Sequence, residues 1–126
     1  MSHKAINPLG TYYYRDAKNR ILHREDGPAL ITAGGSQKWF IDGKPHRVGA
    51  PAIIWFDGDQ DWYLNGKLHR LDGPARQWDC SDSFYINGTQ YLKREFPQAV
   101  AKYVTYIEVT KQDIQTLLGN YRITEW

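Results

Sequence analysis

The stretch LNGKLHRLDGPA, residues 64–75, contains a tight-turn signal followed by a cluster of polar side chains. Asn65-Gly66 lies between two short stretches that contain the apolar residues Leu64 and Leu68, which is a strong hairpin signal because a type I′ turn needs positive φ at both central positions. His69, Arg70 and Asp72 follow within four residues of one another, a combination that suggests an active site or a metal site.

The polar cluster recurs twice upstream. LHREDGPA at residues 22–29, PHRVGAPA at 45–52 and LHRLDGPA at 68–75 are spaced by 23 residues, and we call them the first, second and third copies of the His-Arg motif. A fixed step of this length is typical of a repeat architecture, in which equivalent residues share one role. The shared residues are His23, Arg24, His46, Arg47, His69 and Arg70, with Asp26 and Asp72 in the outer copies and Gly49 in the second.

A turn sequence keeps nearly the same step. WFIDG at 39–43, WYLNG at 62–66 and FYING at 84–88 each place Asp-Gly or Asn-Gly after aromatic residues. We therefore expect a mainly β fold in which hairpins of about 23 residues form an antiparallel meander, one sheet over residues 12–92. The two-residue turn sets the register, with Leu64 opposite Lys67 and Tyr63 opposite Leu68.

The C-terminal part changes period. Phe96, Val100, Tyr103 and Ile107 have the spacing of an amphipathic helix. TKQD at 110–113 predicts a capping box that begins a second helix, with Gly119 as its stop. The expected organisation is an α+β single domain, 1–126, with a hairpin array at 12–92 and a cap of two helices at 93–126.

Composition excludes several protein classes. Net charge is +2 with interspersed signs, which disfavours a general binder of nucleic-acid phosphates. Cys80 is the only cysteine, so no intramolecular disulfide is expected. The N-terminal residues lack the apolar core of a signal peptide, and no apolar run approaches the roughly 20 residues of a membrane helix. We expect a cytoplasmic protein that has no membrane partner.

Repetition argues against catalysis by the polar cluster. An enzyme needs one assembled site, whereas His-Arg-x-Asp occurs at a fixed step and the second copy lacks the acid. We expect each His to pack on a neighbouring ring, each Asp to cap its own turn, and each Arg to pair with a carboxylate across the strands. The sequence therefore predicts a structural motif, no enzyme and no cofactor.

Metal sites are also disfavoured. Equivalent histidines of successive hairpins should lie roughly 9.6 Å apart, whereas zinc holds its nitrogens at roughly 2.1 Å. The DGDQD stretch at 57–61 begins like a calcium loop but has Trp62 and Leu68 where Gly and Glu are needed, so we expect a polar hairpin loop. Acidic neighbours make Cys80 a poor nucleophile.

The aromatic side chains are the remaining candidates for function. Large apolar residues are predicted on both faces of the sheet, and an exposed aromatic surface usually marks a binding site. Trp and Tyr are frequent at protein interfaces, and they also stack nucleobases. The predicted binding residues are Trp39, Phe40, Trp55, Trp62, Tyr63, Trp78 and Tyr85.

The 23-residue step and the W-Y-x-N-G-K-x-H turn resemble MORN repeats. The fuller pattern, LHRxDGPA followed by an apolar strand and WYxNGK, is similar to a variant found in tandem in small proteins of tailed bacteriophages, and YINGTQYLKREF at 85–96 is similar to their ending. The resemblance covers about residues 12–100. It implies a scaffold that binds proteins; lipid binding, known for some MORN arrays, is not carried over because HRxDGPA departs from the MORN pattern.

These observations favour a non-catalytic phage protein that binds and inhibits a host protein or complex, for example an anti-defence protein of the anti-CRISPR type. A scaffold or virion-assembly protein is the alternative. A nucleic-acid binder and an enzyme with an unrecognised site are weaker alternatives. An exposed sheet edge at the end of the array would also allow a homodimer.

Overall fold

The computed structural model describes the backbone of residues 2–118 and the side chains of residues 2–112. The chain divides into two compact units, Met1–Leu92 and Lys93–Trp126. We call them the N-terminal and C-terminal units and describe each by itself.

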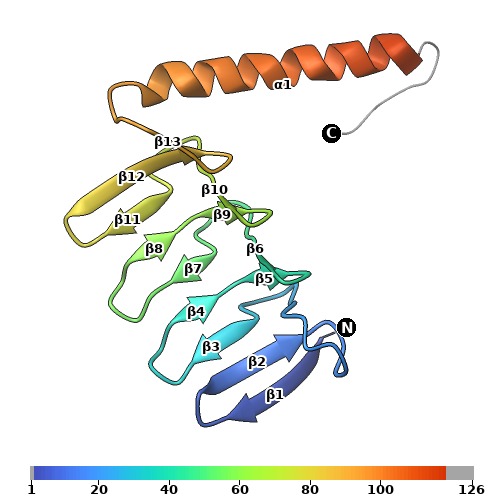
Figure 1. Cartoon of the computed structure of the whole chain (residues 1–126), viewed down its shortest axis with the longest axis vertical. Coiled ribbons are helices and arrows are strands. Elements are labelled where there is room, and N and C mark those ends of the chain that lie inside the picture. The colour runs from blue at the N-terminus through green and yellow to red at the C-terminus, as the bar shows by residue number, and fades with distance from the viewer. Residues whose placement is uncertain (1, 119–126) are drawn as a thin grey trace. The chain divides into compact units, whose positions relative to one another are not determined.

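The N-terminal unit is built from short antiparallel strands (Figure 1). Nine of them form the main sheet in the order β1-β2-β3-β4-β7-β8-β11-β12-β13. Their bounds are β1 His3–Asn7, β2 Gly10–Tyr14, β3 Leu30–Thr32, β4 Gln37–Lys38, β7 Ile53–Ile54, β8 Gln60–Asp61, β11 Arg76–Trp78, β12 Ser81–Ile86 and β13 Thr89–Tyr91. Two further pairs stand apart from it: β5 Phe40–Ile41 with β6 Lys44–Pro45, and β9 Tyr63–Leu64 with β10 Lys67–Leu68.

The expectation of a mainly β, α+β fold with a large antiparallel sheet is confirmed, but the prediction that all hairpins share one sheet is wrong. In each of two repeats, one hairpin belongs to the main sheet and the next forms a separate two-stranded ladder. The chain leaves the main sheet at Trp39 and at Trp62, whose N–H groups donate to Ala52 O at 2.7 Å and Ala75 O at 2.6 Å. Figure 1 shows the short hairpins β5–β6 and β9–β10 along one side of the main sheet.

The sheet also begins earlier than predicted. Strand β1 pairs with β2 through a two-residue connection, Pro8-Leu9, and Asn7 Oδ1 accepts the N–H of Leu9 at 2.8 Å. This turn lacks the Asn-Gly or Asp-Gly sequence on which the prediction relied. The side chain of Asn7 supplies a local acceptor that stabilises the turn instead.

The predicted hairpin turns are confirmed. φ is positive at both central residues of each turn: 48° and 79° at Asp42-Gly43, 51° and 83° at Asn65-Gly66, and 48° and 82° at Asn87-Gly88. The predicted register is also correct, because Leu64 pairs with Lys67 and Tyr63 with Leu68. The turn residues therefore determine the pairing locally.

The alanine that ends each copy of the motif is fully buried in the N-terminal unit. Ala29, Ala52 and Ala75 are 0% exposed. Their carbonyl groups accept the N–H groups of Tyr13, Trp39 and Trp62. A bulkier side chain at these positions would have to displace its surroundings, since protein interiors are close-packed.

The C-terminal unit contains one helix, α1, Phe96–Leu118, so the prediction of two helices is wrong. Thr110 does not begin a new helix: its Oγ1 donates to Tyr106 O at 2.8 Å, the bond of a helix interior to the preceding turn. The predicted stop at Gly119 lies outside the described residues. No helix in the described range is long and apolar enough to cross a membrane.

Candidate functional site

The arginines of the His-Arg motif are held by contacts within the array. Each guanidinium lies over an aromatic ring, and its Nη1 donates to the proline carbonyl four residues later. The ring partners are Tyr13 for Arg24, Trp39 for Arg47 and Trp62 for Arg70, at 3.9, 3.8 and 3.9 Å from the ring centroid. The carbonyl partners are Pro28, Pro51 and Pro74, at 3.1, 3.1 and 3.2 Å.

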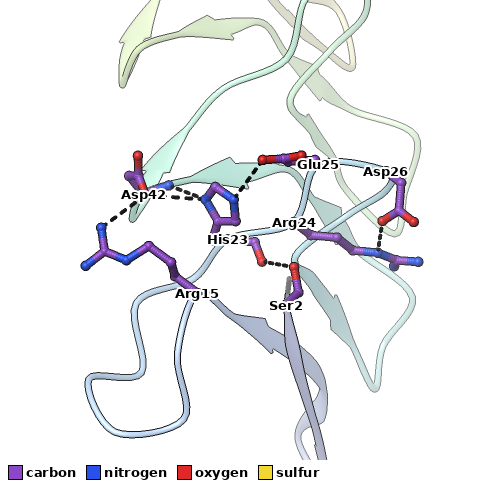
Figure 2. Close-up of polar contacts among 7 residues, drawn as sticks. All are labelled: Ser2, Arg15, His23, Arg24, Glu25, Asp26 and Asp42. Atoms are coloured by element: carbon purple, nitrogen blue, oxygen red, sulfur yellow. Dashed lines mark hydrogen bonds and ion pairs between the residues drawn. The ribbon is translucent and has the colours of Figure 1, made fainter.

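The motif aspartates bind these arginines. Arg24 Nε donates to Asp26 Oδ1 at 3.0 Å (Figure 2), and Arg70 Nε donates to Asp72 Oδ1 at 2.8 Å. The hydrogen bond from Arg70 lowers the pKa of Asp72 below its ordinary value. The expectation that each Arg pairs with a carboxylate across the strands is therefore wrong, because the acid lies two residues later in the same turn.

The motif histidines connect successive repeats. Nδ1 of each accepts the backbone N–H of the first residue of the next hairpin turn. His23 accepts from Asp42 at 3.0 Å, His46 from Asn65 at 2.9 Å and His69 from Asn87 at 3.0 Å. Burial lowers the pKa of His69, which favours the neutral ring that can accept this bond. This contact with the next turn is one that the sequence did not predict.

Figure 2 shows this connection for the first copy, where the ring of His23 lies between Asp42 on one side and Glu25 on the other. Nδ1 of His23 is 3.5 Å from Asp42 Oδ1, and its Nε2 is 3.5 Å from Glu25 Oε1. Ser2 Oγ donates to the carbonyl of His23 at 2.9 Å. Across the described residues, no three His, Cys, Asp or Glu side chains gather as metal ligands would.

Two further backbone bonds strengthen each connection. The turn glycine donates to the residue before the histidine: Gly43 to Leu22 at 2.8 Å, Gly66 to Pro45 at 2.9 Å and Gly88 to Leu68 at 2.8 Å. The arginine N–H donates back to the hairpin: Arg24 to Phe40 at 3.0 Å, Arg47 to Tyr63 at 3.1 Å and Arg70 to Tyr85 at 3.2 Å. The same three bonds thus join three successive pairs of segments, which gives the motif a structural role.

Most of the aromatic residues predicted to bind a partner are half-buried in this framework. Arginines lie over the rings of Trp39 and Trp62. Within the described part of the chain, the buried indole N–H of Trp62 has no hydrogen-bond partner. Phe40, Tyr63 and Tyr85 are also only partly exposed.

The other two predicted residues lie together at the ends of neighbouring strands. Trp55 follows β7 and Trp78 ends β11, and both strands flank β8. Beside them is Phe56, which is 72% exposed, while Trp78 is 38% exposed. We call Trp55, Phe56 and Trp78 the aromatic patch. With Asp57 and Asp59 they line a shallow hollow of about 200 Å³.

One buried carboxylate orients the patch. Asp61 on β8 is 1% exposed and pairs in register with Ile53 and Arg76. Its Oδ2 accepts the indole N–H of Trp55 at 3.0 Å, and its Oδ1 accepts the indole N–H of Trp78 at 2.8 Å and Arg76 Nε at 2.9 Å. The N–H groups of both indole rings are therefore held by the same carboxylate.

A cationic side chain lies over the face of each of these indole rings. Lys38 Nζ lies 4.6 Å from the centroid of Trp55, and the guanidinium of Arg76 lies 4.2 Å from that of Trp78. The role of Asp61 could not be predicted from the repeat, because the equivalent positions of neighbouring repeats hold Lys38 and Ser83. Repeat comparison detects shared framework residues, and Asp61 belongs to a single repeat.

No protein-family model, curated protein or solved structure matches this chain.

Proposed function

We propose that this chain is a non-catalytic, phage-type protein that binds and inhibits a host protein or complex through the aromatic patch. The observation that carries the proposal is the patch itself, in which Phe56 is 72% exposed and two tryptophans are oriented by Asp61. Trp is frequent among interface residues that dominate binding energy. Rings held in place before binding lose little conformational entropy when a partner arrives.

The polar residues of the His-Arg motif support a binding role over a catalytic one. Their donors and acceptors are used to close turns and to join repeats. Because these polar groups bond to one another within the scaffold, the scaffold can carry different side chains at other surface positions without rearranging. The resemblance to phage repeat proteins adds the context: a host-cytoplasmic partner, and an anti-defence role such as the inhibition of a CRISPR complex.

Affinity purification from host lysate tests this proposal, with Phe56→Ala as the test variant and Tyr106→Ala as its control. Tyr106 is 66% exposed on helix α1, so the control removes an exposed ring elsewhere. We expect the wild type and Tyr106→Ala to retain a host protein that Phe56→Ala loses, and the purified partner to lose activity when the wild type is added.

Two results would contradict the proposal. The first is that no host protein or complex is recovered. The second is that Phe56→Ala, folded as judged by circular dichroism, binds and inhibits the partner as well as the wild type does. Recovery of the chain with purified virions instead would favour the alternative role in virion assembly.

A further inference from the structure

The second copy of the His-Arg motif lacks the carboxylate that the other two copies supply. Gly49 stands where Asp26 and Asp72 bind the Nε of Arg24 and Arg70 at 3.0 and 2.8 Å. Arg47 keeps the other contacts of its sister residues, the ring of Trp39 and the carbonyl of Pro51. Among the residues whose side chains are described, it forms no ion pair.

There is open space around Gly49. A Cβ built on Gly49 would meet no heavy atom within 4 Å. Arg47 and Trp39 line an open hollow of about 940 Å³, and Val48 at its rim is 79% exposed. Burial lowers the pKa of Arg47, so this cation is partly withdrawn from water without a carboxylate to compensate.

The other charged groups of the hollow are already engaged. Arg24 pairs with Asp26 at 3.0 Å, and Glu25 lies 3.5 Å from His23 Nε2. These two carboxylates would repel a doubly charged phosphate more than a singly charged carboxylate. In the sister copies, the group beside each Nε atom is likewise a carboxylate.

We propose that Arg47 binds an aspartate or glutamate side chain of a partner polypeptide, which takes the place that Asp26 and Asp72 occupy in the sister copies. Arginine recognises carboxylates through paired, charge-assisted hydrogen bonds, and the ring of Trp39 holds this guanidinium in place. This site is separate from the aromatic patch, so the two proposals can fail independently.

Peptide titration of the full, ¹⁵N-labelled chain tests the site. The probes are acetyl-Gly-Asp-Gly-amide and its neutral counterpart acetyl-Gly-Asn-Gly-amide, and the readout is the Nε–H resonance of each motif arginine, assigned with Arg47→Lys. We expect the Asp peptide to shift the Arg47 signal saturably and to bind at least about tenfold tighter than the Asn peptide. The signals of Arg24 and Arg70 serve as internal controls and should not move.

A matched pair of substitutions at Gly49 tests whether Arg47 binds the peptide because its own copy of the motif has no carboxylate. Gly49 has φ of 80°, a conformation that Asp and Asn both tolerate better than most residues. Gly49→Asp should supply an internal carboxylate and abolish binding of the Asp peptide, whereas Gly49→Asn should retain it. Melting temperatures of both variants establish that they fold.

Four results would overturn the inference: no shift of the Arg47 signal, equal binding of both peptides, equal binding to both Gly49 variants, or a common shift of all three arginines. Stronger binding of inorganic phosphate than of the Asp peptide would also overturn it, since the site would then be a general anion site.

Discussion

At the scale of single residues, the carboxylate of Asp61 has the largest structural consequences. It is 1% exposed and accepts hydrogen bonds from two indole N–H groups and one guanidinium. A buried carboxylate is costly unless its oxygens are paired, and here Arg76 supplies the opposite charge. Two tryptophans of different repeats are thereby fixed relative to each other within the aromatic patch.

We expect Asp61→Asn to lower the free energy of unfolding by about 2–3 kcal/mol. The amide has one acceptor oxygen where the carboxylate has two, and it leaves Arg76 without its counter-charge. Urea unfolding followed by circular dichroism measures the change. Asp82→Asn, an exposed substitution on β12, is the control and should stay within about 0.5 kcal/mol of the wild type. A change of that small size for Asp61→Asn would contradict this account of the patch.

The connection formed by His69 makes stability depend on pH. Burial lowers the folded-state pKa of His69 below its ordinary value of 6.5, so the unfolded chain takes up the proton at higher pH than the folded chain. Its contribution is complete above about pH 6.5 and is lost as the pH falls from that value through the lower pKa of the folded state. We therefore expect the free energy of unfolding to decrease from pH 8 toward pH 5, a range in which His is the side chain that ordinarily titrates.

Urea unfolding at several pH values checks this expectation, and His69→Gln identifies the residue. The variant should be less stable than the wild type at pH 8, because the bond from Asn87 is altered, but its stability should depend less on pH. A wild type that becomes more stable on acidification, or a variant with an unchanged slope, would show that the neutral ring is not required.

At the scale of the element, the type I′ turns determine where each hairpin reverses and which residues pair. Gly66 has φ of 83°, and the nearest atoms to a Cβ there belong to the side chain of Lys44, at 3.6 Å, an ordinary van der Waals distance. The cost of a side chain at this position is therefore conformational rather than a steric clash with neighbours. The same geometry recurs at Gly43 and Gly88, with φ of 79° and 82°.

We expect Gly66→Ala to lower the free energy of unfolding by about 1–2 kcal/mol, the cost of the left-handed conformation for a residue with a Cβ. Gly34→Ala is the matched control, because its φ lies outside the left-handed region and the nearest atom to its Cβ is Thr32 Oγ1 at 4.0 Å. The control should be neutral or slightly stabilising. Equal losses in thermal unfolding for both variants would contradict the assigned role of the turn.

Helix α1 shows where a local pattern misleads. TKQD at 110–113 has the spacing of a capping box, but Thr105 and Thr110 both donate their hydroxyl groups to the carbonyl four residues earlier. A threonine can bond back to the helix in this way or cap a new one, and the sequence contains both options. The continuous hydrogen-bonded backbone from Phe96 to Leu118 decides between them.

At the scale of the whole molecule, the N-terminal unit gains stability from contacts that repeat. Few side chains are fully buried, and the innermost alanines occur at the 23-residue step. The three hydrogen bonds that join each motif copy to the next turn occur at the same step. In such arrays the stability is roughly a sum over repeats and their interfaces.

The array should therefore accept one more repeat. We expect a second copy of residues 47–69, inserted after His69, to fold in register and to unfold at a temperature equal to or above that of the wild type, because the insertion adds one more interface. Thermal unfolding followed by circular dichroism is the measurement. The same 23 residues in scrambled order are the control and should lower the melting temperature. If the ordered insertion destabilises the chain as much as the scrambled one, the repeats are not interchangeable.

The sequence by itself determined the features that depend on neighbouring residues. The repeat step, the three type I′ turns and the register across Asn65-Gly66 were all predicted, because backbone φ and side-chain alternation are local properties. The location of the aromatic pair, Trp55 and Trp78, at equivalent positions also followed from the repeat, although its function stays a prediction.

Only the tertiary structure decided the rest. It places the short hairpins outside the main sheet. It also brings together residues of different segments, in the hydrogen bonds that the histidines accept from the next turn and in those that Asp61 accepts from two indoles. The pairing of Arg70 with Asp72 is close in sequence, yet the choice of this partner over one across the strands depends on how Trp62 and Pro74 position the guanidinium. These interactions depend on three-dimensional proximity, which turn chemistry and periodicity do not encode.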